Sequence, residues 1–269
     1  MENLFVCVVL QLLNSIGAVF FVGFAIAWIN KLFYILLGRA GEKVCLATGL
    51  IGTPVHEIGH AFFCVLFRHR ITEMRLYRPN KSDGTLGYVT HEWDGRSIYQ
   101  RVGNFFIGTG PIIFGSGTLA VLMWALIPKT FDMFARHLRT FIDAMLTARV
   151  EKLPGLIFNV FADFFALANL TDPRWLLYTV LACCIALHLN LSKPDIHGAK
   201  PGAVLFAIVV AVPNLALFFF GDKTLDAYNR NFLTVCLFAS GVMLLCLFFS
   251  TAALAIAFLL ERLKKLVKK

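Results

Sequence analysis

Long runs of apolar residues without charge constrain this chain most. A hydrocarbon core about 30 Å thick needs roughly 20 consecutive apolar residues in a helix. Because lipid offers no hydrogen-bond partners, a spanning run of this kind must be helical. Six runs meet or approach this length: residues 4–29, 44–67, 102–127, 175–192, 203–220 and 232–260. The sequence therefore predicts an all-α membrane protein with about six transmembrane helices, forming one domain over residues 1–269.

Composition supports a membrane protein and excludes a soluble one. Hydrophobic residues make up 58% of the chain and charged residues 15%, against roughly 25% charged in an average soluble domain. The net charge of +9 comes from basic residues between and after the apolar runs, which indicates contact with the membrane surface and no nucleic-acid partner. We expect both termini to be cytoplasmic because the C-terminal tail is basic. Its basic residues are Arg262, Lys264, Lys265, Lys268 and Lys269.

Residues 130–153 differ from the spans because apolar and charged residues alternate there with helical spacing. Phe131, Phe134 and Leu138 recur at steps of three and four, which predicts an amphipathic helix lying in the membrane interface. Residues 156–171 follow with Asp163 as the single charge. This segment is too short to span comfortably, so it is either re-entrant or a seventh membrane element.

Residues 71–91 are polar and alternate with period two. Met74 and Leu76 precede a turn-forming stretch, and Tyr88 follows it. This pattern predicts a β-hairpin turning at Asp83-Gly84, with a solvated basic loop as the alternative.

The second apolar run contains His56-Glu57-Ile58-Gly59-His60. Residues four apart share one face of a helix, so His56 and His60 can bind one metal ion while Glu57 lies beside it. Ionisable residues are costly in a membrane segment and usually serve a function. The alternative is that the three side chains only satisfy one another inside a helix bundle.

Catalytic zinc sites usually have three protein ligands and one open position. Asp195, between two apolar runs, is the best third candidate. Ser192 lies three residues earlier, so Asp195 can also belong to a capping box, and capping and ligation are compatible. His188 is the rival ligand, and His197 is a weaker choice.

Thr53-Pro54 lies just before the histidine motif. Proline is tolerated in the first turn of a helix, so the helix carrying the motif could begin in mid-membrane after a break at residues 49–52. A continuous helix kinked at Pro54 is equally compatible with the sequence.

Together, the HExxH motif, Gly108-Thr109-Gly110-Pro111 and the later Asp195 to Gly198 resemble the site-2 protease family of intramembrane zinc metalloproteases. The resemblance covers about residues 44–198. It implies that His56, His60 and Asp195 bind Zn²⁺, that Glu57 is the catalytic base, and that hairpin 71–91 holds an unwound substrate segment. The setting of Asp195 departs from the family's usual Asn-Pro-Asp-Gly and is similar to a less-characterised branch without a PDZ domain.

The expected function is hydrolysis of peptide bonds in membrane-embedded segments of other proteins, with the bilayer and those proteins as partners. His188 and Asn190 are candidate polar residues of the active site. Alternatives are a metalloprotease with a Glu ligand such as Glu151, a lipid hydrolase, a catalytically silent scaffold, and an ion-coupled transporter that uses the His and Asp cluster.

Overall fold

The computed structural model describes residues 2–80 and 84–267, and it is mostly helical with one small β-hairpin. Five of its helical segments are long and apolar enough to cross a membrane, which indicates a multi-pass membrane protein. They are Leu4–Leu37, Ile98–Leu126, Val150–Leu170, Lys193–Phe218 and Asp222–Lys264.

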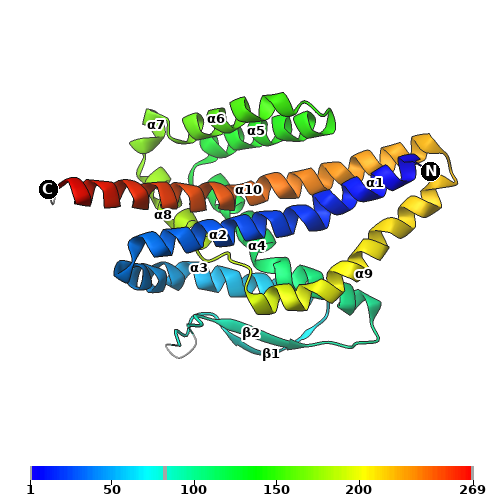
Figure 1. Ribbon diagram of the computed structural model, residues 1–269, viewed down its shortest axis with the longest axis horizontal. Helices are drawn as coiled ribbons and strands as arrows, with labels where there is room; N and C mark the ends of the chain where they lie inside the picture. The colour runs from blue at the N-terminus through cyan, green and yellow to red at the C-terminus, as the bar shows by residue number, and fades with distance from the viewer. Residues whose placement is uncertain (1, 81–83, 268–269) are drawn as a thin grey trace.

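The helices form an elongated bundle (Figure 1). Their bounds are α1 (Glu2–Leu12), α2 (Ala18–Leu37), α3 (Arg39–Leu66), α4 (Ile98–Leu126), α5 (Pro128–Leu146), α6 (Leu153–Phe164), α7 (Leu167–Leu170), α8 (Pro173–Ala186), α9 (Lys193–Phe218) and α10 (Asp222–Val267). A π-helical turn, Leu13–Gly17, joins α1 to α2, and a 3-10 turn, Val150–Lys152, precedes α6. Helix α1 begins at one end of the long axis and α10 finishes at the other (Figure 1). That both termini are cytoplasmic stays a prediction.

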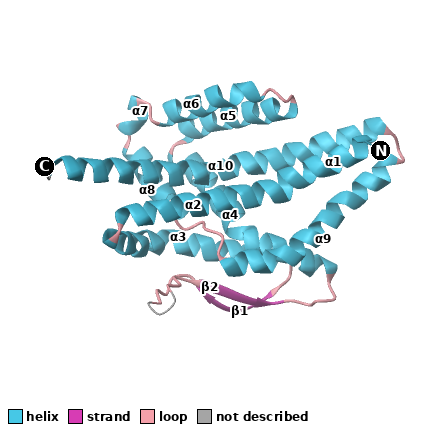
Figure 2. Ribbon diagram, in the orientation of Figure 1, coloured by secondary structure: helices cyan, strands magenta, loops and turns pink. Residues whose placement is uncertain are grey.

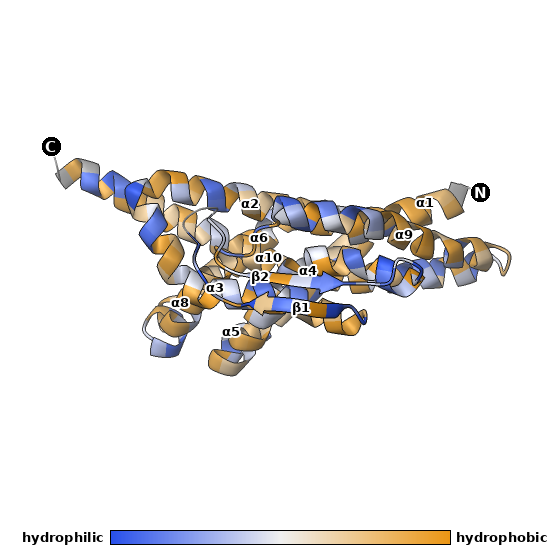
Figure 3. Cartoon of the chain, turned by 90° about the horizontal axis from the view of Figure 1, so that it is seen from below, coloured by the Kyte–Doolittle hydropathy of each residue, from blue (hydrophilic) through white to orange (hydrophobic). Residues whose placement is uncertain are grey.

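Helix α4 lies at the centre of the bundle and packs against both α3 and α9. The main core includes Ile112 and Leu119 of α4, Tyr178 of α8 and Phe249 of α10, each at most 1% exposed. Residues of the long helices are mostly hydrophobic (Figure 3), and many of their large apolar side chains are exposed. Trp28, for example, is 65% exposed. An outer face of this composition is suited to lipid.

Helix α3 contains the predicted span 44–67 but is not among the five candidate spans. It carries Arg39, Glu42 and Lys43 in its first turns and the polar motif in its second half, so its hydropathy is low. The helix continues through Pro54 without interruption. Of the two possibilities for the Thr53-Pro54 segment, the structure has the continuous helix.

The predicted span 175–192 is wrong in its last third, residues 187–192. Helix α8 has only 14 residues and ends at Ala186, and residues 187–192 form an irregular segment that leads into α9. The run has no formally charged residue, so its length and hydropathy did not indicate this early end, which places the backbone carbonyl of His188 near the candidate metal centre described below.

The amphipathic helix predicted at 130–153 is α5, which ends earlier, at Leu146. The following segment is not one helix, because α6 ends at Phe164 and α7 forms a separate turn. Val150–Leu170 as a whole nevertheless qualifies as a candidate span, which favours the seventh membrane element predicted for residues 156–171.

The predicted hairpin is confirmed. Strands β1 (Arg70–Arg75) and β2 (Tyr88–Glu92) pair antiparallel, with a bulge between Ile71 and Glu73. They lie along one side of the helical bundle (Figure 2). The hydroxyl of Tyr77 donates to the carbonyl of Leu46 over 2.7 Å and so ties the connection between the strands to α3. Asp83 of the predicted turn lies outside the described residues, as do Lys268 and Lys269 of the basic tail.

Candidate metal centre

Three predicted ligands meet where α3 faces the start of α9. His60 Nε2 lies 3.3 Å from Asp195 Oδ1 and 3.2 Å from His56 Nε2, and His56 Nε2 lies 4.0 Å from Asp195 Oδ2. Ligand atoms from all three side chains lie within 4.8 Å of one another. The group is a possible metal-binding site, and it is the only cluster of three His, Cys, Asp or Glu of this kind in residues 2–80 and 84–267.

Backbone carbonyls orient both imidazole rings. His56 Nδ1 lies 2.8 Å from the carbonyl oxygen of His188, and His60 Nδ1 lies 2.8 Å from that of Ile107. Because a carbonyl oxygen only accepts, each Nδ1 carries its proton and donates. In a neutral imidazole this leaves a lone pair on Nε2.

The centre therefore fits a cation. The two Nε2 lone pairs face each other over 3.2 Å, with the Asp195 carboxylate beside them. Such an arrangement is repulsive by itself, and a cation between the three groups would relieve the repulsion. Fixing the ligand tautomer through the other ring nitrogen is the usual arrangement of metal-binding histidines.

Pro111 explains why the carbonyl of Ile107 is free. In a regular helix this oxygen would accept from the N–H four residues later, but residue 111 is a proline and has none. His60 supplies the missing donor. Gly59 allows the close approach that this bond requires, because a Cβ at Gly59 would lie 2.8 Å from Pro111 Cα.

The carbonyl of His188 is free because α8 ends at Ala186 and His188 lies two residues later, in a segment without a regular helical or strand partner. His56 donates to His188. The Asn30 side-chain amide donates to the carbonyl of Ala186 over 2.9 Å. The early end of α8 thus provides an anchor for the first histidine.

Asp195 has the capping role that the sequence allowed and also lies beside the two histidines. The Ser192 hydroxyl accepts from the Asp195 backbone N–H over 3.2 Å, and the Ser192 N–H donates to Asp195 Oδ2 over 2.8 Å, which completes a capping box. The carboxylate is thereby held in place while Oδ1 faces His60. Gly108 lets α9 approach α4 here, because a Cβ at Gly108 would contact the Asp195 carbonyl oxygen.

Glu57 is 6% exposed on α3, one residue after His56. Its carboxylate has no hydrogen bond or ion pair with any described residue. It is therefore available to a bound molecule.

The remaining predicted residues lie apart from the ligand group. The His188 ring contacts the Thr48 hydroxyl, with 2.9 Å between Nε2 and Oγ1, so the residue contributes its backbone carbonyl to the centre. Asn190 accepts from Asn30 over 2.9 Å. Glu151 and His197 are exposed and do not join the ligand group.

A second histidine pair beside the centre was not predicted. His69 follows α3 and His91 lies on β2, with their Nδ1 atoms 3.0 Å apart. His69 Nε2 donates to the carbonyl of Gln100 over 2.9 Å. The His69 Nδ1 therefore accepts, and the His91 Nδ1 donates. The two histidines are 22 positions apart in the sequence, so only the predicted pairing of the two hairpin strands could have indicated that they lie side by side.

No protein-family model, curated protein or solved structure matches this chain. The function is therefore inferred from the geometry of the centre and its surroundings.

Proposed function

We propose that this protein is a zinc metalloprotease that hydrolyses peptide bonds in membrane-embedded segments of other proteins, as the resemblance to site-2 proteases implies. The observation that carries the proposal is the paired Nε2 atoms of His56 and His60, aimed at each other and at Asp195. Two imidazoles and one carboxylate form a ligand set that zinc hydrolases use, with a fourth position left for water or substrate.

A bound zinc ion would supply Lewis acidity, which lowers the pKa of a water molecule and polarises a carbonyl. The chain's own residues would hold the ion and transfer the proton. His56, His60 and Asp195 hold the centre, and the buried Glu57 carboxylate takes the proton of the attacking water and returns it to the leaving amine.

The hairpin is the proposed binding place for an unwound substrate segment. The segment that connects its two strands lies against α3 just before the histidine motif. Gly87 of this segment approaches α3 so closely that a Cβ on it would lie 2.9 Å from Thr53 Cγ2. The described part of the sheet has only two strands, β1 and β2. Each strand thus has one edge without a strand partner, and an extended segment can bind such an edge through main-chain hydrogen bonds.

The experiment compares membranes from cells that express wild type, Glu57→Gln or Glu42→Gln, and identifies newly formed protein N-termini by mass spectrometry. Glu42 is an exposed residue in the first turn of the same helix and is the matched control. We expect new N-termini with wild type and Glu42→Gln, and a loss of about 10²–10⁴-fold with Glu57→Gln.

Identical N-termini with wild type and Glu57→Gln would contradict the proposal. An ion flux in proteoliposomes that survives Glu57→Gln, without any cleavage, would support the transporter alternative instead.

A further inference from the structure

A cavity of about 440 Å³ lies between α5, α6 and α10, and none of its lining residues belongs to the metal centre. Its walls are almost entirely apolar. On α6 the lining residues Leu153, Leu156, Val160 and Phe164 recur at helical spacing, so one continuous face of that helix lines the cavity. Its volume is in the range of sites that bind small molecules.

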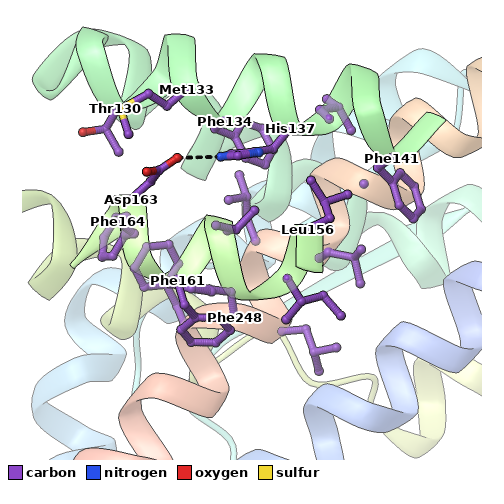
Figure 4. A pocket seen from close by; sticks show the side chains of 18 of the residues that line it. Thr130, Met133, Phe134, His137, Phe141, Leu156, Phe161, Asp163, Phe164 and Phe248 are labelled. Atoms are coloured by element: carbon purple, nitrogen blue, oxygen red, sulfur yellow. Dashed lines mark hydrogen bonds and ion pairs between the residues drawn. The ribbon is translucent and has the colours of Figure 1, made fainter. Parts of the chain in front are cut away.

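One end of the cavity is polar. His137 Nε2 donates to Asp163 Oδ2 over 2.7 Å, and Thr130 lies at the same end (Figure 4). Asp163 is the single charged residue of segment 153–171. An ionisable residue in an apolar membrane segment usually serves a function, and the proposed protease leaves this one unused.

This polar end has unused hydrogen-bonding capacity. Asp163 Oδ1 accepts no hydrogen bond from any described residue. The hydroxyl of Thr130 also forms no hydrogen bond with a described residue, although Thr130 is only 6% exposed. A head group that donates a hydrogen bond would satisfy Asp163 Oδ1. A carboxylate or phosphate would be repelled by Asp163, and an ammonium would compete with His137 for the same carboxylate. A neutral hydroxyl meets these requirements best.

The cavity opens to the outer surface of the helical bundle. Two of its lining residues, Ile157 and Leu244, are 58% and 38% exposed. Both belong to candidate membrane spans, Val150–Leu170 and Asp222–Lys264. The bilayer is therefore the nearest source of an apolar ligand.

We propose that this cavity binds a neutral lipid, with its hydrocarbon chain between α5, α6 and α10 and a hydroxyl head hydrogen-bonded to Asp163 and Thr130. Long-chain alcohols and monoacylglycerols share this chemistry. The site is independent of the metal centre and of the proposed proteolysis.

The test uses the full chain in detergent micelles and a hexadecanol probe that carries a photoreactive diazirine in mid-chain and a terminal alkyne. After irradiation, labelled peptides are mapped by mass spectrometry. We expect labels within residues 130–164 and 241–251. Capture should exceed that of the matching hexadecanoic acid and hexadecyl methyl ether probes about tenfold, the effect of one hydrogen bond to a charged group. Competition for probe capture by unlabelled hexadecanol or by unlabelled monopalmitoylglycerol shows whether the cavity prefers a long-chain alcohol or a monoacylglycerol.

Variants separate the tail site from the head site. Leu156→Trp fills the cavity and should abolish capture of every probe, whereas Phe158→Trp, at a 71% exposed position that does not line it, should leave capture unchanged. Thr130→Val removes only a hydroxyl and should lower capture of the alcohol but not of the ether. Asp163→Asn removes the charge and should raise capture of the acid relative to the alcohol.

Only variants that elute as monodisperse protein are compared. Equal capture of the alcohol, acid and ether by wild type, labels outside the two expected segments, or equal losses with Leu156→Trp and Phe158→Trp would overturn the proposal.

Discussion

The Nδ1 atom of His60 lies 2.8 Å from the carbonyl oxygen of Ile107, the oxygen that Pro111 leaves without a donor in its own helix. A proline inside the continuous helix α4 therefore leaves free the Ile107 carbonyl that orients His60, a candidate metal ligand on α3. This relationship connects the Gly108-Thr109-Gly110-Pro111 segment to the metal centre through one hydrogen bond.

Pro111→Ala should weaken metal binding. Alanine restores the backbone N–H that competes with His60 for the Ile107 carbonyl, and losing a bond that orients a ligand typically costs about 10- to 100-fold in affinity. The measurement is zinc affinity by competition with a chelator. Pro213→Ala, which changes another proline inside a helix, is the control and should leave affinity unchanged. An unaltered affinity in Pro111→Ala would show that the Ile107 bond does not orient His60.

His188→Gln should keep its metal, because His188 contributes a backbone carbonyl while its ring contacts Thr48. Glutamine can preserve the contact with Thr48. His56→Gln should lose the metal, since it removes a ligand. Elemental analysis of the two purified variants measures how much metal each retains. Loss of metal in His188→Gln would make His188 the third ligand in place of Asp195.

Ser192→Ala removes the hydroxyl that caps α9 but leaves the Ser192 N–H bond to Asp195 Oδ2. The free energy of unfolding should fall by about 1 kcal/mol, and metal should still bind. Thermal unfolding in detergent, with and without added zinc, measures both effects. Complete loss of metal would mean that the cap, and not the backbone bond, positions the carboxylate.

The hairpin should lose stability as the pH falls from about 6.5 toward 4. Burial lowers the pKa of His91 to about 4, with the nearby His69 and His60 adding to the effect, and burial also lowers the pKa of His69. The unfolded hairpin therefore binds protons more readily than the folded one in this range. Protonation would also put two N–H groups face to face at the 3.0 Å contact.

Hydrogen exchange over residues 70–92, measured across this pH range, checks the prediction. His91→Asn should flatten the pH dependence. A wild-type hairpin whose exchange protection is equal at pH 6.5 and pH 4.5 would contradict it.

The two histidines of the candidate metal centre and the helix cap at Asp195 could be predicted from the sequence because their signals are local. His56 and His60 are one helical turn apart, and Ser192 with Asp195 has the spacing of a capping box. The two carbonyl acceptors could not be predicted directly, because every residue carries a backbone oxygen. For Ile107 there was an indirect signal, because Pro111 lies four residues later and cannot donate to its carbonyl.

The membrane topology was less predictable for a physical reason. Residues 175–192 contain no formally charged residue and are mostly apolar, so mean hydropathy does not reveal that α8 ends at Ala186, although polar residues recur from His188 onward. Conversely, the charges that accompany the metal-binding motif keep α3 below the hydropathy of an ordinary span. Packing inside the bundle determines both where α8 ends and how α3 is accommodated, and hydrophobic periodicity carries no information about that packing.

The most direct test of the central claim is the zinc content of the purified protein, measured by elemental analysis for wild type, Asp195→Ala and Asp222→Ala. Asp222 also lies in the first turn of a helix but outside the centre, so its variant is the matched control. We expect one zinc ion per chain in wild type and in Asp222→Ala, and little or none in Asp195→Ala. Wild type that binds no zinc even after reconstitution, or Asp195→Ala that retains it fully, would contradict the account.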